Sequence, residues 1–363
     1  MNLNALTINN QPFTNSELQL FSKEKTLDRK TPSWEKSVYQ FILYWLSDTD
    51  SILQYSSGTT GKSKKLQLLK SSMIRSAENT CRYFNLEKAQ TAALCLPMEY
   101  IAGKMMVVRC IVGGLNLCLV EPTSMPDLKG LDNVDFCAMV PLQVMNTLNK
   151  STDLPRIKKL IVGGAEISTD LEKLLQKLLF EVYATYGMAE TCSHVAIRRL
   201  NGPDHQLDYH ALPGITLARD DRDCLVIKAD YLPDTIVTND LVEFTSSVSF
   251  KWLGRYDNLI NSGGIKIVPE EVEAIVAEKM GLECAVIGLP DEKLGHKLVF
   301  VFEKKRTSFP LPELKTFLEK QLPRHIKPKE IILVEKFPRN NSLKIDRIKI
   351  KTACAGCSDK KTL

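Results

Sequence analysis

The chain has 363 residues, of which 44% are hydrophobic and 25% are charged, which is typical of a water-soluble protein with about two or three domains. Its net charge of +5 is modest, and the basic residues form no arginine-rich block, so nucleic acid is excluded as an expected partner. The most apolar long stretch, 105–120, is interrupted by Arg109 and by glycines, and the N-terminus lacks a signal-peptide pattern, so we expect no membrane span and a cytoplasmic location.

Cysteines are frequent, and the ten of them are scattered through apolar segments. This pattern is typical of reduced cytosolic thiols and not of a disulfide framework. Cys354 and Cys357 form a single CxxC pair near the C-terminus. A zinc site would need a second pair or histidines, so we expect these two residues to belong to a disordered end.

The first clear pattern is a glycine-rich turn between two strands. Residues 52–55 and 66–69 have the apolar pattern of strands, and a helix pattern begins only near Ser71. The turn reads SSGTTGKSK, in which Gly58 and Gly61 let backbone N–H groups approach an anion closely. Hydroxyl and ammonium donors come from Ser56, Ser57, Thr59, Thr60, Lys62 and Lys64. We predict a loop that binds polyphosphate, with a solvated hairpin turn as the alternative.

The turn also has a partial likeness to the P-loop of kinases and ATPases, because Gly61-Lys62-Ser63 matches the end of that motif. The first glycine of a P-loop would have to be residue 56, which is Ser56. A P-loop also opens directly into a helix that holds the phosphates, whereas a strand is expected here. We therefore reject the P-loop interpretation.

Short apolar strands alternate with helix-period segments up to about residue 250, which favours an α/β sheet. The expected strands are 92–96, 115–120, 136–140, 160–162 and 181–184.

A smaller α+β unit with a different spacing of strands and helices follows. Pro269 and two glutamates are expected to begin a helix that ends at Gly281. The unit is completed by strands at 284–288, 298–302 and 331–334 and a helix at 312–322. We expect two domains, 1–256 and 257–363, joined by a tight hinge near Asp257.

Four motifs follow the glycine-rich turn: YGMAET at 186–191, TND at 238–240, GRYDN at 254–258 and PRNNSLKIDR at 338–347. In this order they resemble the acyl-adenylate-forming superfamily of acyl-CoA ligases, luciferases and peptide-synthetase adenylation domains. The resemblance implies an enzyme that uses ATP and Mg²⁺ to convert a carboxylic acid to an acyl-AMP and, in the ligases, passes the acyl group to coenzyme A. It also implies a large α/β N-terminal domain, shortened here because the turn comes unusually early, and a small mobile α+β C-terminal domain.

The resemblance assigns roles that also have chemical reasons. Tyr186, followed by Gly187, would present its ring to adenine, and Glu190 would hold Mg²⁺ together with phosphate oxygens. Asp240 would accept the ribose hydroxyls, with Arg255 as a further donor near the sugar. Out of context, these would be a core tyrosine, a solvated glutamate and a turn aspartate.

Lys344 is the residue that the resemblance implies for the first chemical step. Its ammonium would relieve the repulsion between the attacking carboxylate and the α-phosphate. Rotation at Asp257 would then withdraw Lys344 and bring Gly263 and Gly264 toward the pantetheine path of coenzyme A. The alternatives are a surface lysine and an ordinary loop turn.

The chain departs from the family pattern at Ser63, Ala189 and Leu343, where proline, threonine and glycine are usual, and in TND, which replaces TGD through Asn239. Loss of the threonine removes one phosphate or carboxylate contact, for which nearby Thr191 is a partial substitute. These departures keep open the hypothesis of a nucleotide-binding protein that has lost catalysis.

Residues 96–114 and 191–197 resemble most the short o-succinylbenzoate-CoA ligases of bacterial menaquinone synthesis. Such a substrate calls for an apolar slot and a cation that faces its second carboxylate. Tyr100 stands where the family commonly has a histidine, and the other candidates for the acid site are Lys104, Arg109, Gly163, Gly164, Ala165 and His194. The alternative for the three basic residues is that they are solvated or paired within the protein. A ligase for another aryl or aliphatic acid, or an adenylation enzyme that loads a carrier-protein thiol, is the alternative.

Overall fold

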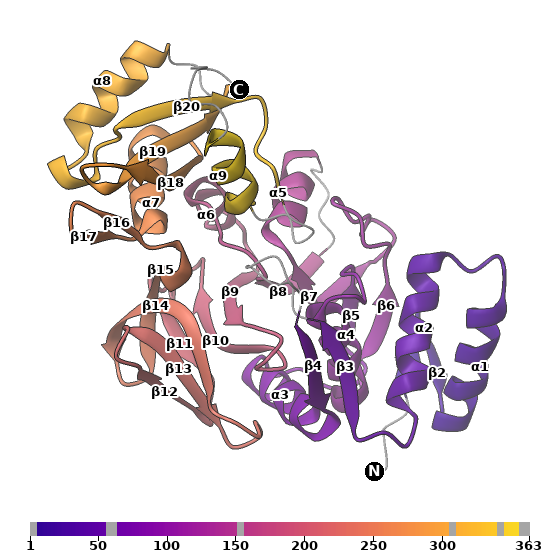
Figure 1. The fold of residues 1–363 in the computed structure, drawn as a ribbon. Coiled ribbons are helices and arrows are strands. Elements are labelled where there is room, and N and C mark those ends of the chain that lie inside the picture. Colours follow the sequence, from indigo (N-terminus) through magenta and orange to yellow (C-terminus); the bar gives the residue numbers. More distant parts are fainter. Residues whose placement is uncertain (1–5, 56–63, 151–155, 305–309, 340–344, 356–363) are drawn as a thin grey trace. The chain divides into compact units, whose positions relative to one another are not determined.

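The structure of the chain is a computed structural model that describes residues 6–55, 64–150, 156–304, 310–339 and 345–355 (Figure 1). The chain divides into two compact units. The first unit comprises Met1–Ile167, Leu174–Leu217 and Ile227–Ile236. The second unit comprises Ser168–Lys173, Ala218–Val226 and Val237–Leu363. The domain boundary predicted at 256/257 stays a prediction.

The first unit contains most of the parallel strands and the longer helices. Its elements are β1 Leu6–Ile8, β2 Gln11–Phe13, α1 Asn15–Leu27, α2 Ser33–Trp45, β3 Ser51–Tyr55, β4 Lys65–Leu69, α3 Lys70–Tyr83, β5 Thr91–Leu94, α4 Ile101–Gly113, β6 Asn116–Leu119, β7 Asn133–Met139, α5 Pro141–Lys150, β8 Arg156–Val162, β9 Glu181–Gly187, β10 His194–Arg199 and β11 Tyr209–Ala211. Four further elements have residues in both units: α6 Thr169–Leu175, β12 Ile215–Arg219, β13 Cys224–Ala229 and β14 Ile236–Ser246.

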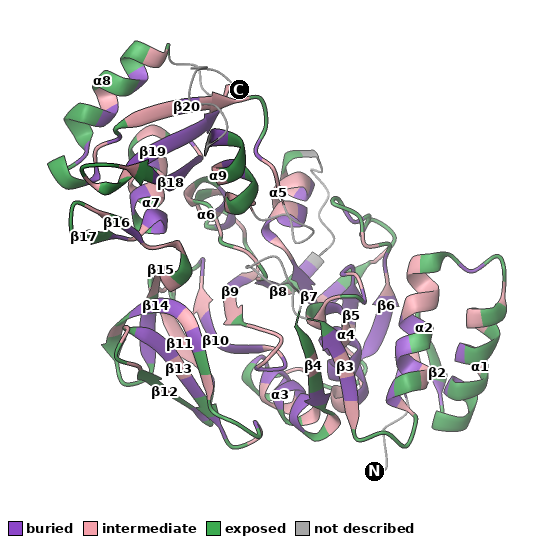
Figure 2. Cartoon of the chain, in the orientation of Figure 1, coloured by how far each residue is buried: buried purple, intermediate pink, exposed green. Residues whose placement is uncertain are grey.

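Within the first unit the strands follow the order β11-β10-β9-β8-β7-β5-β6-β1-β2. Neighbours from β9 to β1 are parallel, whereas β1–β2, β9–β10 and β10–β11 are antiparallel. The central strands are buried because both faces of a parallel sheet are covered, which is why they read as continuous apolar runs (Figure 2). The five expected strands are confirmed as β5 to β9, with ends shifted by a few residues.

The second unit has its own core. Its remaining elements are β15 Ser249–Arg255, η1 Tyr256–Asn258, β16 Ile260–Ser262, β17 Ile265–Ile267, α7 Pro269–Met280, β18 Cys284–Asp291, β19 Gly295–Glu303, α8 Leu311–Gln321, η3 Arg324–Ile326, β20 Glu330–Val334 and α9 Arg347–Ala355. Strands β18 and β19 pair antiparallel and β20 adds parallel to β19, while α7 and α8 contribute to a cluster with Phe300 and Phe302. The predicted helix is confirmed as α7, which begins at Pro269 and ends before Gly281 in a left-handed conformation, with φ of 63°.

The expectation of a disordered end is wrong for Cys354. This residue lies on α9 and is only 5% exposed, because it packs with Ile350 against residues of β18 and β19 in a second core cluster. Cys357 lies outside the described residues. The nine cysteines in the described part of the chain are buried. No helix among these residues has the length and apolar character that crossing a bilayer requires.

Candidate active site

The centre of the predicted phosphate loop and the proposed catalytic lysine lie outside the described residues. This applies to Ser56, Ser57, Gly58, Thr59, Thr60, Gly61, Lys62, Ser63, Leu343 and Lys344. The segments that flank 56–63 are described: β3 pairs antiparallel with β4, with Tyr55 opposite Lys65. Lys64 is exposed just before β4. The turn is therefore flanked by two strands, as predicted, and the helix that a P-loop would require does not follow it directly.

Gln54, at the end of β3, ties this strand to the start of α4. Its Nε2 donates to the carbonyl oxygen of Glu99 at 2.9 Å, and its Oε1 accepts a hydrogen bond from Nζ of Lys104. Burial lowers the pKa of Lys104. Lys104 is thus paired within the protein. Tyr100 occupies the N-cap of α4, the helix that carries Lys104. The sequence carried no signal for Gln54, because its two partners lie 45 and 50 residues away.

A cavity of about 320 Å³ opens beside this segment, at the carboxyl ends of β5 and β6. Ligands of parallel α/β sheets commonly bind at this edge. Eight apolar and three polar residues line it, and its exposed surface is polar and apolar in nearly equal parts. The lining residues are Ser33, Trp34, Ser37, Val38, Leu94, Leu96, Pro97, Met98, Glu99, Val120 and Pro122.

Arg109 and His194, both predicted for the acid site, lie together. Arg109 is on α4 and is 2% exposed. Its Nη2 donates to Oγ of Ser193 at 2.5 Å and lies 3.4 Å from Nδ1 of His194, while Nη1 lies 3.6 Å from Sδ of Met106. Among the described residues its Nε has no hydrogen-bond partner. On the far side of the ring, Nε2 of His194 is 3.1 Å from Oγ1 of Thr80.

The charges in this group are unusual for a protein interior. Burial lowers the pKa of Arg109 to about 10, so the guanidinium still carries its charge at pH 7. Burial, and then the charge of Arg109, hold the pKa of His194 well below its usual value, so the imidazole is neutral. None of these described neighbours of Arg109 is a carboxylate. A buried cation without a counter-charge is energetically unfavourable.

Tyr186 lies near the end of β9, at the hairpin that leads to β10. Its ring makes an edge contact with Tyr209, with centroids 6.0 Å apart. A side chain at Gly187 would place a Cβ atom 2.3 Å from the carbonyl oxygen of Ser193, so only glycine permits this approach of the two strands. The glycine that follows Tyr186 thus has a packing reason in this structure.

Glu190 lies in the turn between β9 and β10. This turn is held by Thr191, whose Oγ1 accepts from the backbone N–H of Met188 at 3.0 Å and lies 2.7 Å from the carbonyl oxygen of Ser193. The Thr191 hydroxyl is completely buried, so it is not exposed to a phosphate and does not substitute for a threonine at Ala189. No group of three or more possible metal ligands exists among the described residues, but Mg²⁺ commonly takes one or two carboxylates plus phosphate oxygens, so Glu190 fits such a role.

Asp240 and Arg255 face each other across the β14–β15 pair. Nη1 of Arg255 lies 3.3 Å from Oδ1 of Asp240, and Nε1 of Trp252 donates to the same oxygen at 3.2 Å. The Asp240 side chain is 9% exposed, and its backbone N–H donates to Oγ1 of Thr238 at 3.0 Å. The carboxylate of Asp240 is therefore held in place by two side-chain donors, and its role as the ribose acceptor stays a prediction.

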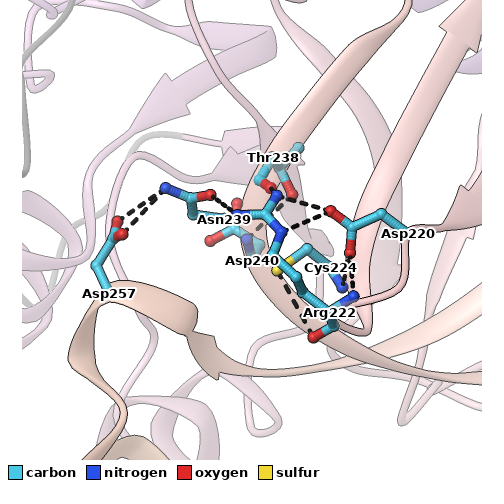
Figure 3. A network of polar contacts seen from close by, with 7 residues as sticks. All are labelled: Asp220, Arg222, Cys224, Thr238, Asn239, Asp240 and Asp257. Carbon is cyan, nitrogen blue, oxygen red and sulfur yellow. Dashed lines mark hydrogen bonds and ion pairs between the residues drawn. The ribbon is translucent and has the colours of Figure 1, made fainter.

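Asp257 belongs to a polar network beside this pair (Figure 3). Nδ2 of Asn239 donates to both oxygens of Asp257, and Oδ1 of Asn239 accepts from Nη1 of Arg222 at 2.9 Å. Arg222 in turn forms an ion pair of 2.6 Å with Asp220. Asp220 and Arg222 lie in a charged turn without a recognisable motif, so the sequence carried no signal for their role.

Gly163, Gly164 and Ala165 follow β8, which pairs with β9, the strand that carries Tyr186. Gly263 and Gly264 form the turn between β16 and β17 with φ of 60° and 84°, which favours glycine at both positions. Turn geometry therefore accounts for this pair, and their role in the coenzyme A path stays a prediction.

Comparisons with known proteins agree with this arrangement. The family model described as AMP-binding enzyme matches residues 13–221, and the model of the AMP-binding enzyme C-terminal domain matches residues 271–344. The curated 2-succinylbenzoate--CoA ligase of Bacillus subtilis is 24% identical over 348 residues, covering 86% of this chain and 71% of that protein.

Solved structures give the same result. An acyl-CoA synthetase (AMP-forming)/AMP-acid ligase II-like protein from Dyadobacter fermentans is 33% identical, with a TM-score of 0.60, over 93% of this chain and 98% of that chain. The o-succinylbenzoate coenzyme A synthetase of Bacillus subtilis, in complex with ATP and magnesium, has a TM-score of 0.71 at 21% identity, over 93% and 82% of the two chains. The expected fold, a large α/β N-terminal domain of the adenylate-forming type with a small C-terminal α+β domain, is confirmed. The chain belongs to the AMP-binding enzyme family and is an AMP-forming acid–CoA ligase.

Proposed function

We propose that this enzyme is an o-succinylbenzoate–CoA ligase that acts in the cytoplasm in menaquinone biosynthesis. The observation that carries the proposal is the buried guanidinium of Arg109, whose described partners are all neutral. A substrate with a second carboxylate would supply the counter-charge that this cation lacks, and an Arg–carboxylate pair gains strength in a dry site. The similarity along most of the chain to 2-succinylbenzoate--CoA ligases supports the same substrate.

The nucleotide would be held by three groups. Tyr186 would stack on adenine, Asp240 would accept the ribose hydroxyls, and Arg255 would donate near the sugar while it keeps Asp240 in place. The loop 56–64 would hold the phosphates. Mg²⁺, bound by Glu190 and phosphate oxygens, would offset charge on the triphosphate.

The chemistry would proceed in two steps. A carboxylate oxygen of the acid attacks the α-phosphorus of ATP, the bond to the β-phosphate breaks, and pyrophosphate leaves. Lys344 would stabilise the charge that develops in this step. The thiolate of coenzyme A then attacks the acyl carbon and AMP leaves, after rotation at Asp257 has exchanged Lys344 for Gly263 and Gly264.

The acid pocket would lie near Tyr100, with Gly163, Gly164 and Ala165 along the aromatic ring and Arg109 at the distal carboxylate. His194 would orient Arg109 as a neutral acceptor. Lys104 would act through Gln54 and not by direct contact, since the two side chains are hydrogen bonded to each other.

The full-length protein is to be incubated with o-succinylbenzoate, ATP and Mg²⁺, with and without coenzyme A, while pyrophosphate release is followed and the product is weighed by mass spectrometry. We expect acyl-AMP without coenzyme A and the thioester with it. A faster reaction with another acid, or transfer only to a carrier-protein thiol, would replace the proposed substrate or acceptor. ATP binding without turnover of any acid would indicate a protein that has lost catalysis.

The Lys344→Ala variant tests the first step. It is expected to slow acyl-AMP formation by about 100-fold or more and to leave thiolysis of supplied acyl-AMP largely intact. Lys349→Ala is the matched control, because Lys349 has an exposed side chain on α9 and makes only a short-range ion pair with Asp346. Equal rates for Lys344→Ala and this control would contradict the assigned role.

A further inference from the structure

We infer that Asn239 is a positioning residue that fixes the proposed pivot, Asp257, and couples it to the proposed ribose carboxylate, Asp240. The inference rests on the proposed function, in which the chain turns at Asp257 between two half-reactions. The family usually has glycine at this place, so the contact is made by a side chain that the usual sequence lacks. It follows from the network in Figure 3, all of which lies in the second unit.

The amide of Asn239 holds both oxygens of the Asp257 carboxylate. Nδ2 lies 3.0 Å from Oδ1 and 3.1 Å from Oδ2. Asp257 is the middle residue of η1, the short 3-10 helix Tyr256–Asn258 that follows β15. The carboxylate is exposed, but a charge-assisted hydrogen bond is stronger than a neutral one, so two contacts with Asn239 restrain the backbone that carries it.

The orientation of the Asn239 amide is set from its other side. Oδ1 accepts from Nη1 of Arg222, so Nδ2 must face Asp257 and the amide cannot be flipped without losing both contacts. Arg222 is itself fixed: Nε and Nη2 both donate to Oδ2 of Asp220, and Nη2 also donates to the carbonyl oxygen of Thr238 at 3.1 Å. Its guanidinium lies over the ring of Tyr256, 5.1 Å from the centroid. The restraint on Asp257 is therefore anchored in a rigid turn.

The same carboxylate is linked to the ribose site. Nη2 of Arg255 donates to Oδ2 of Asp257 at 2.9 Å, while Nη1 of Arg255 contacts Oδ1 of Asp240. A rotation at Asp257 that breaks its bond with Asn239 also breaks its bond with Arg255, and so changes the contact between Arg255 and Asp240. In this way the conformation at Asp257 and the affinity for the nucleotide are coupled.

A purely structural role makes a different prediction. If Asn239 only fastened the turn at Asp220–Asp223 to β14, its loss would lower the stability of the protein. Exchange around Asp257 and the ratio between the rates of the two half-reactions would then stay as in the native protein. The positioning role predicts faster hydrogen–deuterium exchange around Asp257 and a changed ratio between the rates of the two half-reactions. The two roles are therefore separated by measurements at Asp257 and not by stability alone.

The local test is hydrogen–deuterium exchange of the full-length protein over residues 255–262. Asn239→Gly is expected to speed exchange there about fivefold or more, the scale of one lost charge-assisted hydrogen bond. Asn239→Asp keeps the acceptor for Arg222 but places a second carboxylate against Asp257, so it should loosen the segment further. Asn239→Asp combined with Asp257→Asn restores a donor–acceptor pair and should return exchange to within about twofold of native.

Asn85→Gly is the matched control, since Asn85 is exposed after α3 and already has a φ of 48° that suits glycine. Exchange at 255–262 that is as slow in Asn239→Gly as in this control would overturn the inference. This readout needs no substrate, so it stands even if the proposed substrate is wrong.

The functional test compares the rates of pyrophosphate exchange and of thioester formation. Asn239→Gly is expected to change their ratio about fivefold or more, and the double variant to restore it. An unchanged ratio in Asn239→Gly would contradict coupling. Failure of the native protein to turn over o-succinylbenzoate would instead count against the proposed function, and the ratio would then be measured with the acid that the panel identifies.

Discussion

Nη2 of Arg109 lies 3.4 Å from Nδ1 of His194, inside the first unit, and both side chains are buried. Because a guanidinium can only donate, Nδ1 must accept, and the ring proton sits on Nε2. That nitrogen faces Oγ1 of Thr80, whose own hydroxyl donates to the carbonyl oxygen of Ser76 at 3.1 Å. One neutral tautomer thus satisfies the whole chain of contacts.

This arrangement predicts that the protein loses stability in mild acid. The pKa of His194 is lower in the folded state than in the unfolded chain, so between these two values the unfolded state binds more protons. Stability should therefore fall as the pH drops below about 6.5, by up to about 1.4 kcal/mol per pH unit from this residue. Urea unfolding between pH 7.5 and 5 measures the slope.

His194→Gln should remove that part of the slope, because no group at this position then titrates. His325→Gln is the control, since His325 is exposed in η3. If His194→Gln and the native protein kept the same pH dependence, another group would be responsible.

Arg109→Met should separate stability from substrate binding. Methionine fills much of the volume without a buried charge, so the free energy of unfolding is expected to stay the same or to rise. The KM for o-succinylbenzoate should increase about tenfold or more, since the second carboxylate loses its cation. The KM for benzoate or another monocarboxylate should not change. Both quantities are obtained from steady-state kinetics and chemical unfolding.

Arg75→Met is the matched control, because Arg75 has an exposed side chain on α3 and pairs with Glu78. A marked loss of stability in Arg109→Met without a change in KM would mean that Arg109 serves the fold alone.

Asp240→Asn should weaken the selection of the ribose. An amide keeps the shape of the carboxylate but loses the charge, so the KM for ATP is expected to rise about tenfold or more. The native preference for ATP over 2′-deoxy-ATP should shrink in the variant, which measures the role at the sugar directly. Asp230→Asn, at an exposed carboxylate outside this network, provides the same chemical change away from the site. Unchanged selection between the two nucleotides would place the ribose elsewhere.

The local elements were largely predictable because their signals are local. Apolar runs predicted β5 to β9, and Pro269 and Gly281 marked both ends of α7. Helix α9 was missed because Ile350 and Cys354 are its buried apolar residues, whereas Ile348 is exposed and four other positions are basic or polar. Its apolar face becomes meaningful only once β18 and β19 are present to cover it.

The site was predictable as a set of motifs but not as a set of contacts. Arg109 and His194 were both candidates for the acid site, yet their pairing joins residues 85 positions apart, which no local pattern encodes. The same holds for Gln54 with Lys104, and for Arg222 with Asn239. Residues whose role lies in holding another side chain carry no motif of their own, since the fold alone brings the partners together.

The last prediction concerns Arg347, the final residue of the sequence motif 338–347 that contains Lys344. Its guanidinium makes two bonds of 2.6 Å to the carboxylate of Glu273 on α7, and that carboxylate also accepts from the backbone N–H of Val286. Burial raises the pKa of Glu273, and Arg347 opposes this shift. Arg347→Met would leave two buried carboxylates without their cation, Glu273 and also Glu270, which lies 3.5 Å from Nη2 of Arg347, so the free energy of unfolding should fall by about 3–5 kcal/mol.

The triple variant Arg347→Met with Glu273→Leu and Glu270→Gln should recover most of this loss, because it removes all three charges and keeps the oxygen that accepts from Asn258. Thermal unfolding of the full-length protein measures both effects, with Lys349→Met as the control on the same helix. If the triple variant were as unstable as the single one, the loss would come from packing and not from unpaired carboxylates. A stable triple variant that forms acyl-AMP slowly would further support the proposed role of Lys344, because this cluster of charges lies beside the motif that contains it.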